Sequence, residues 1–238
     1  MNPKDLNRWQ HLTRDGSVRW LKYSWGPGTA NTLAARLADG TWMVVAPSVG
    51  PTSSIFEDLS KDGTVSALIA PNAYHYLGQQ AWRLYFPGAR SYAPAGALAR
   101  LSRKSPDVSY RSASDLIETM HPTVTFLVPE GMKSPDMLVR VSAAGSTVWW
   151  MGDLFTNSAA DDQNWLLRTI APLAGSGLGY RRNSRPGLIY VRNSKAWLHS
   201  ITDALDAEPP SIVVPAHGNP VTEDTARRTR SLLRESPQ

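Results

Sequence analysis

The sequence predicts a single α/β domain whose sheet carries helices on its outer faces. In its first third, short runs alternate apolar and polar side chains, as half-buried strands do. Further along, short apolar runs alternate with stretches of helical spacing. No linker composition interrupts this order, so we expect one domain over residues 17–238, preceded by an N-terminal arm over residues 1–16.

Strand-like segments dominate the first hundred residues. We expect strands at 17–25, 32–37, 41–46, 65–70 and 89–92. Asp39-Gly40 lies between the second and third of these and is a strong hairpin signal. The run VSALIA at 65–70 is apolar throughout and predicts a strand buried on both faces. Helical spacing is expected at 51–61, 79–85 and 95–103.

The second half continues the alternation. Strands are expected at 123–128, 137–141, 147–150 and 211–215, with a short strand or helix entry at 188–191. Helices are expected at 163–173, 194–207 and 222–235, the last two capped by Ser194 and Thr222. The segment 175–187 is rich in Gly, Arg and Ser, which predicts a mobile loop.

Composition excludes several classes of protein. The 238 residues include no cysteine, so thiolate zinc sites, disulfides and cysteine nucleophiles are excluded. The net charge is +5, but the basic residues are scattered, so nucleic acid is not an expected partner. No apolar run is long enough to span a membrane, and the polar start of the chain lacks a signal-peptide core. We therefore expect a cytoplasmic protein without a membrane partner.

Two of the five histidines stand in functional contexts. His75 and His217 each follow a short apolar strand and lie in a loop of small or turn-forming residues, while Asp153 directly follows the apolar run TVWWMG. Open sheets place their ligands at such strand ends, and these three side chains could converge on a two-histidine, one-carboxylate site. The remaining histidines are expected to be solvated or structural: His11, His121 and His199.

The order of these parts resembles the metallo-β-lactamase superfamily. There, a buried strand leads into T-H-x-H-x-D-H-x-G, a later strand ends in G-D, and another ends in a histidine near the C-terminus. Here the corresponding places are taken by APNAYHYLG, STVWWMGDLF and SIVVPAHGNPV, with VPEGMKSPDMLVRV at the third-ligand loop. The resemblance implies a four-layer αβ/βα sandwich with its metal site at one sheet edge.

The metal-binding motif departs from the family pattern, which suggests a divergent branch. On an alignment through Gly78, the motif aspartate falls on His75 and the next histidine falls on Tyr76. Three ligand positions carry side chains that do not bind divalent ions: Pro71, Ala73 and Met132. The resemblance thus implies that one metal site is lost and that His75, Asp153 and His217 remain of the other.

The first functional hypothesis is a hydrolase with one divalent ion on these three residues. Zinc is the first candidate, and iron or manganese are alternatives. Asp153 and Tyr76 would be the catalytic residues, with Tyr76 orienting the substrate or stabilising an oxyanion. The substrate would be a small molecule, and an anionic one would meet the arginines of the 175–187 loop: Arg181, Arg182 and Arg185.

Two other hypotheses stay open. A metal-free, inactive descendant would bind a small molecule or a protein partner, with Asp153 and His217 kept for structural reasons. An interaction protein would use its nine tryptophans. Trp149 and Trp150 are adjacent on one strand and must point to opposite faces, one into the core and the other under a helix or onto the surface.

Overall fold

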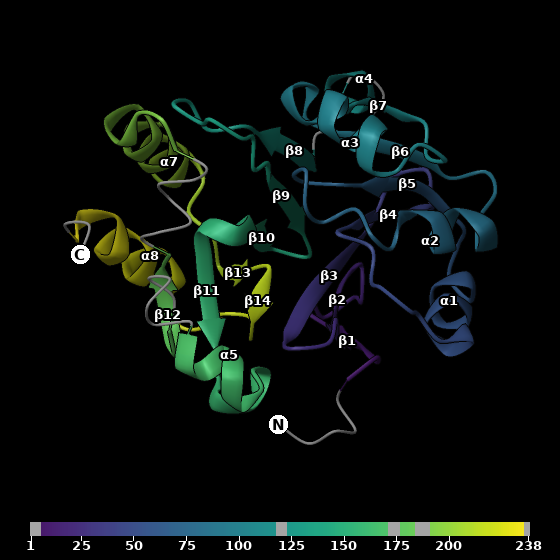
Figure 1. The fold of residues 1–238 in the computed structure, drawn as a ribbon, viewed down its shortest axis with the longest axis horizontal. Coiled ribbons are helices and arrows are strands. Elements are labelled where there is room, and N and C mark those ends of the chain that lie inside the picture. The colour runs from purple at the N-terminus through teal and green to yellow at the C-terminus, as the bar shows by residue number, and fades with distance from the viewer. Residues whose placement is uncertain (1–5, 118–122, 171–176, 184–190, 236–238) are drawn as a thin grey trace.

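The first sheet occupies the N-terminal half of the chain (Figure 1). The computed structural model describes residues 6–117, 123–170, 177–183 and 191–235. Within these residues the sheet has seven strands in chain order: β1 (Trp9–His11), β2 (Val18–Ser24), β3 (Thr29–Arg36), β4 (Trp42–Val45), β5 (Val65–Ile69), β6 (Arg90–Ala93) and β7 (Tyr110–Ser112). Pairing is antiparallel from β1 to β4 and parallel from β4 to β7.

The C-terminal half supplies two smaller sheets. Among the described residues, the larger has the order β13-β10-β9-β8, built from β8 (Val124–Leu127), β9 (Leu138–Ala143), β10 (Ser146–Trp150) and β13 (Ile212–Val214). The smaller has the order β12-β11-β14, built from β11 (Phe155–Ser158), β12 (Gly179–Arg182) and β14 (His217–Gly218). A single 3₁₀ turn, Gly152–Leu154, carries the chain from β10 into β11.

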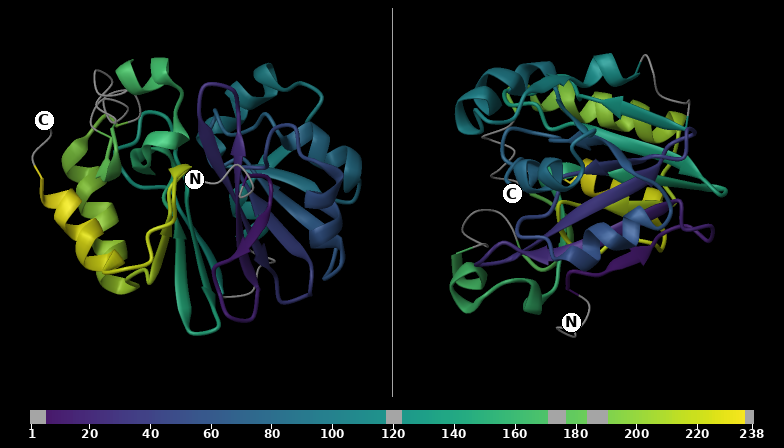
Figure 2. Two further views of the ribbon diagram at one scale, coloured as in Figure 1. Left: turned by 90° about the horizontal axis from the view of Figure 1, so that it is seen from below. Right: turned by 90° about the vertical axis from the view of Figure 1, so that its right-hand side faces the viewer.

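Helices cover the outer faces of both halves (Figure 2). The described α-helices are α1 (Ser53–Ser60), α2 (Gln79–Tyr85), α3 (Leu98–Lys104), α4 (Ala113–Ile117), α5 (Trp165–Ile170), α7 (Ser194–Ala207) and α8 (Thr225–Arg234), with further 3₁₀ turns at Ala95–Ala97 and Ala160–Asp162. Side chains of α1 and α2 pack on the seven-stranded sheet, the first sheet. Side chains of α7 and α8 pack on the four-stranded sheet, which is called the second sheet below. The expected αβ/βα sandwich is therefore confirmed.

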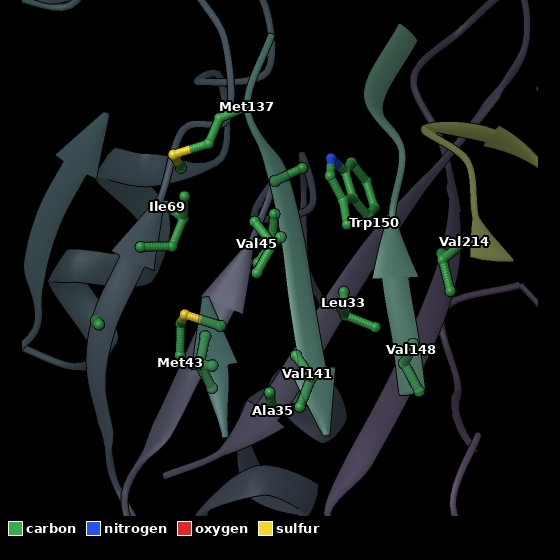
Figure 3. Close-up of a cluster of buried hydrophobic side chains, with 14 of the residues drawn as sticks. Leu33, Ala35, Met43, Val45, Ile69, Met137, Val141, Val148, Trp150 and Val214 are labelled. Carbon is green, nitrogen blue, oxygen red and sulfur yellow. The ribbon is translucent and has the colours of Figure 1, made fainter. Parts of the chain in front are cut away.

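The main core lies between the seven-stranded sheet and the four-stranded sheet (Figure 3). Leu33 and Val45 from the first sheet lie in one buried cluster with Val148, Trp150 and Val214 from the second. Because strand side chains alternate between faces, the neighbouring residues of the same strands point outward, and they pack beneath the helices.

The two adjacent tryptophans follow this alternation. Trp150 lies between the sheets and Trp149 lies under α7, and both are fully buried. Their opposite orientation confirms the expectation from strand geometry. A buried tryptophan removes about 200 Å² from water, which is worth about 5 kcal/mol. This pair therefore stabilises both faces of the four-stranded sheet, one against the seven-stranded sheet and one against α7, and offers no exposed patch to a partner.

The described part of the expected N-terminal arm, residues 6–16, is anchored to the domain. β1 pairs with β2, and Trp9 is buried with its indole Nε1 donating to the backbone oxygen of Ile55 at 2.9 Å. The polar composition of this segment hid one apolar anchor. Trp9 fastens the arm to α1.

Several short elements differ from what the sequence predicts. Residues 179–182, expected in a mobile loop, form β12 and pair with β11; residues 175–176 and 184–187 of that loop lie outside the described residues. The pairing is cross-strand and long-range, so local composition gave no signal of it. The elements β7, α4 and β11 were likewise not expected, because each is too short to carry a periodic pattern.

Both predicted helix caps are wrong. Asn193, not Ser194, caps α7, and its side-chain oxygen accepts from the backbone nitrogen of Ala196 at 3.2 Å. Helix α8 begins at Thr225 rather than near Thr222. Val221 exchanges two backbone hydrogen bonds with Val213, at 2.8 and 3.0 Å, which keeps the chain extended up to this point.

No helix in the described ranges is long and apolar enough to cross a membrane.

Candidate metal centre

Three predicted residues from three separate strand ends converge on one point. His75 follows β5, Asp153 lies in the turn after β10, and His217 begins β14. Asp153 Oδ1 lies 2.8 Å from His75 Nε2 and 3.3 Å from His217 Nε2. One potential ligand atom from each residue lies within 4.8 Å of the other two. In the part of the chain that the structure describes, this is the one such group of three.

Asn72 fixes the loop that carries His75. The Asn72 side-chain oxygen accepts from the backbone nitrogens of Tyr74 at 2.8 Å and His75 at 2.9 Å. Such a turn reproduces a backbone turn with a side chain. The Asn72 Nδ2 donates to Asp136 Oδ1 at 2.9 Å and to Asp153 Oδ2 at 3.0 Å. One fully buried side chain thus sets the loop and aligns the carboxylate opposite it.

Asp136 supports Asp153 from below. Its Oδ2 accepts from the backbone nitrogen of Asp153 at 2.8 Å, and its side chain is fully buried. Gly152 makes this approach feasible, because a Cβ there would lie 2.2 Å from Asp136 Oδ2. Gly152 also has a φ of +62°, a region that L residues rarely adopt. Asn183 Nδ2 completes the frame by donating to the Asp153 carbonyl oxygen at 2.6 Å.

His217 is oriented from behind by the backbone. Its Nδ1 lies 2.8 Å from the carbonyl oxygen of Thr29 at the start of β3. The side chain is 30% exposed, compared with 10% for His75. The ring of Trp25 lies 6.5 Å from the His217 ring, centroid to centroid, so an aromatic side chain borders the open side of the site.

Burial and neighbouring charges shift the pKa values of three side chains in the site. Burial works against charge on His75, but the Asp153 carboxylate more than offsets it, so the pKa of His75 is raised. Burial also works against charge on Asp153, yet the attraction and hydrogen bonds of the two histidines hold its pKa well below the usual range. Burial and the neighbouring Asp153 charge raise the pKa of Asp136 to about 7. Of the two carboxyl groups, Asp153 is therefore the one that carries the negative charge of the site.

The hydrogen bond to Thr29 decides what His217 offers the site. A carbonyl oxygen only accepts, so His217 Nδ1 carries a proton. In the neutral ring Nε2 then has a lone pair, which faces Asp153 Oδ1 at 3.3 Å. Two acceptors at this distance attract each other only through a cation between them, either a proton on Nε2 or a metal ion. Two imidazole nitrogens and one carboxylate oxygen are a donor set that zinc, iron and manganese accept.

Tyr76 lies away from this group. Its partly buried side chain packs against the apolar cluster that contains Ala73 and Leu101, on the α3 side of the loop. Pro71 and Ala73 are buried, and Met132 packs on the cluster beneath α7. The loss of metal ligands at these three positions stays a prediction, as does the catalytic role of Tyr76.

The other candidates are dispersed. His11 and His199 are exposed, and His199 Nε2 lies 3.3 Å from Asp203 Oδ2 on its own helix. Arg181 is exposed on β12, whereas Arg182 points to the other face, with its guanidinium 6.0 Å from the Trp197 ring. His121 and Arg185 lie outside the described residues.

Two supporting residues escaped the sequence reasoning. Asn72 follows the strand run that leads to His75, and its place between Pro71 and Ala73 suggested only a turn. Asp136 precedes β9, at the beginning of a strand, whereas only residues after strands were considered. A polar residue directly before a buried apolar run was the available signal for Asp136.

Comparison with known proteins places the fold. No family model and no curated protein sequence matches the chain. Among solved structures, TMB-1, in a study of substrate and inhibitor binding, is 16% identical with a TM-score of 0.56, and the match covers 94% of this chain and 96% of TMB-1. The DIM-1 metallo-β-lactamase is 15% identical with a TM-score of 0.59, over 95% of this chain and 96% of DIM-1. A second DIM-1 structure, exposed to ceftazidime, is 14% identical with a TM-score of 0.54, over 95% of both chains. The chain therefore has the metallo-β-lactamase fold over nearly its whole length.

Proposed function

We propose that this chain is a hydrolase that uses one divalent metal ion held by His75, Asp153 and His217. Zinc is the first candidate, and iron or manganese are alternatives. The observation that carries the proposal is the contact between His217 Nε2 and Asp153 Oδ1 at 3.3 Å, on an oxygen that His75 Nε2 also approaches at 2.8 Å. With its proton on Nδ1, a neutral His217 ring directs the Nε2 lone pair at this carboxylate, and a divalent ion bound between the two would satisfy both.

The surrounding residues suit that role. Metal-bound histidines usually donate their second ring nitrogen to a backbone or carboxylate oxygen, and ligand carboxylates are themselves hydrogen-bonded. The Thr29 carbonyl oxygen accepts from His217 Nδ1, and Asn72 Nδ2 donates to Asp153 Oδ2. A divalent ion with three protein ligands and an open position lowers the pKa of a water molecule towards neutrality. Asp136 accepts a hydrogen bond from the backbone nitrogen of Asp153 and so helps to hold the Asp153 carboxylate in position.

The substrate in this proposal is a small molecule that reaches the site past Trp25. The TMB-1 and DIM-1 structures concern substrates, inhibitors and an antibiotic, which supports a small-molecule substrate here. The register of the small sheet pairs Thr156 with both Arg181 and His217, so these three side chains lie on one face. An exposed arginine on the face of His217 favours an anionic substrate.

Metal analysis of the purified protein tests the proposal. Protein prepared without chelator, loaded with zinc and dialysed should hold one ion per chain. His217→Ala should lose it, whereas Tyr76→Phe, which removes a hydroxyl from the α3 side, should retain it. Hydrolysis of a panel of lactones, thioesters, phosphoesters and β-lactams by the loaded protein then identifies the class. Absence of retained zinc, iron and manganese would overturn the proposal.

The metal-free alternative has one observation of its own. His75 and Asp153 already form a hydrogen-bonded ion pair at 2.8 Å, and Asn72 satisfies the second carboxylate oxygen. A cluster satisfied in this way can persist as structure without an ion. Under this alternative, His75→Gln would leave the binding of the small molecule or protein partner unchanged. No divalent ion would alter the melting temperature.

A further inference from the structure

A buried lysine lies beneath the segment that carries His217. Lys22 is on β2, is fully buried, and is paired in register with Asn31 on β3. Side chains at paired positions share a face of the sheet, so both of these polar groups face the same interior layer. Burying a lysine is costly unless it is fully paired. Its presence in mid-strand therefore indicates a specific structural task.

Lys22 joins two distant parts of the chain. Its Nζ donates to Asp162 Oδ1 and to Asn219 Oδ1, each at 2.6 Å. Asp162 is also buried, and its Oδ1 accepts from Thr29 Oγ1 at 3.0 Å, while its Oδ2 accepts from the backbone nitrogen of Ala159 at 2.7 Å. Thr29 is the residue whose carbonyl oxygen faces His217 Nδ1. The ion pair thus contacts both the His217 segment and the group that orients its ring.

Asn31, on the neighbouring strand β3, forms hydrogen bonds with the segment 215–219 that carries His217. Its Nδ2 donates to the carbonyl oxygens of Pro215 at 2.8 Å and Gly218 at 2.7 Å. Its backbone nitrogen donates to the carbonyl oxygen of Ala216 at 2.9 Å. Lys22 and Asn31 together therefore hold residues on both sides of His217, and His217 itself is left with a ring free to face Asp153.

We propose that Lys22, Asn31 and Asp162 form a buried polar cradle that positions His217 as a metal ligand. They are positioning residues, since each acts through the 215–219 segment or through Thr29. This inference rests on the proposed metal-binding function. It adds that the cradle sets the tautomer and direction of the His217 ring through Asn219, 197 residues from Lys22, and through the Thr29 carbonyl, 188 residues from His217.

Asn219 offers the gentlest way to test the cradle. Its side-chain oxygen is the link from Lys22 to the segment, while its backbone bonds to Asn157 are independent of the side chain. Asn219→Ala removes the link, and Asn219→Asp keeps an acceptor for Nζ. A second variant, the double substitution Lys22→Met with Asp162→Asn, removes both charges together and avoids leaving one of them buried alone. The surface pair Arg230–Asp206 provides the control, as Arg230→Met with Asp206→Asn.

Two readouts separate the cradle from the metal proposal. Zinc affinity should fall about tenfold or more in Asn219→Ala and in the double variant, as for other outer partners of metal ligands. It should stay near the wild-type value in Asn219→Asp and in the surface control. In the metal-free protein at about pH 8, nitrogen NMR of the His217 ring should show a protonated Nδ1 in wild type. The same spectrum should show mixed tautomers in Asn219→Ala.

The outcomes are distinct. If wild type binds no zinc, the proposed function fails, and the ring spectra alone decide whether the cradle orients His217. If wild type binds zinc and Asn219→Ala matches it in affinity and ring spectrum, the cradle is overturned. A loss in Asn219→Ala that Asn219→Asp does not restore also overturns it. Loss with rescue, at unchanged circular dichroism, supports it.

Discussion

The two histidines of the site are held in different ways. His75 is 90% buried as a side chain, bonds Asp153 directly at 2.8 Å, and owes its loop to Asn72, three residues before it. His217 is 30% exposed, stands 3.3 Å from the same carboxylate, and depends on groups from β2 and β3. The His75 loop is buried and held by a residue three positions away, whereas the His217 side is held by distant segments and opens to solvent.

This difference predicts that substitutions on the two sides change stability and metal binding to different extents. Breaking a buried, paired group costs the desolvation of its partner, so changes on the His75 side should lower stability as well as metal binding. On the more exposed His217 side, solvent can replace a lost partner, so changes there should lower metal binding with a smaller effect on folding.

The largest effect is expected at the residue both sides share. Asp153→Asn removes the charge that both histidines face, while keeping the shape of the side chain. Zinc affinity should fall by more than about 100-fold, beyond the range typical for outer partners. Isothermal titration with zinc measures this. Affinity within tenfold of wild type would show that the ion binds elsewhere.

Two glycines test the backbone on either side. Gly152→Ala would place a Cβ 2.2 Å from Asp136 Oδ2, and Gly218→Ala would place one 2.1 Å from the carbonyl carbon of Asn157. Both have positive φ, so each should cost at least about 2 kcal/mol in strain and overpacking. Gly218→Ala should cost more, because it meets the backbone of β11 rather than a side chain. Urea unfolding compares them, and equal stability to wild type would contradict this packing.

Removing each histidine sharpens the contrast. His75→Ala in the metal-free protein leaves Asp153 buried without its closest partner, so the free energy of unfolding should fall by about 1–3 kcal/mol. His217→Ala should cost less than about 1 kcal/mol, because its ring is partly solvated. Both variants should lose zinc. If the stability costs were reversed, the assignment of a buried and an open side would be wrong.

Stability should also depend on pH, and this dependence should arise on the His75 side. The pKa of Asp136 is raised to about 7 in the folded protein, against about 4 when unfolded. The folded state therefore holds this proton over that interval, and stability falls as pH rises from about 4 towards 7. The raised pKa of His75 acts in the same direction above about 6.5. Urea unfolding of the metal-free protein should show this slope, and Asp136→Asn should flatten it. A slope unchanged in Asp136→Asn would assign it to other groups.

The same contrast explains what sequence could predict. Strand periodicity predicted an α/β domain with helices on its outer faces, and strand-end positions predicted that His75, Asp153 and His217 converge. The resemblance to the metallo-β-lactamase superfamily implied the four-layer sandwich. The turn of Asn72 is also local and was open to prediction. By contrast, Lys22 to Asn219 spans 197 residues and His217 to Thr29 spans 188, and no local pattern encodes such contacts. The burial of Trp9 and the pairing of β12 escaped for the same reason.

A crystal structure of the zinc-loaded protein tests the central claim most directly. Anomalous diffraction at the zinc edge should show one peak bonded to His75 Nε2, His217 Nε2 and a carboxylate oxygen of Asp153, at about 2.0–2.2 Å from each. The Thr29 carbonyl should still accept from His217 Nδ1. A protein that crystallises in excess zinc with no peak between these three side chains would contradict the account.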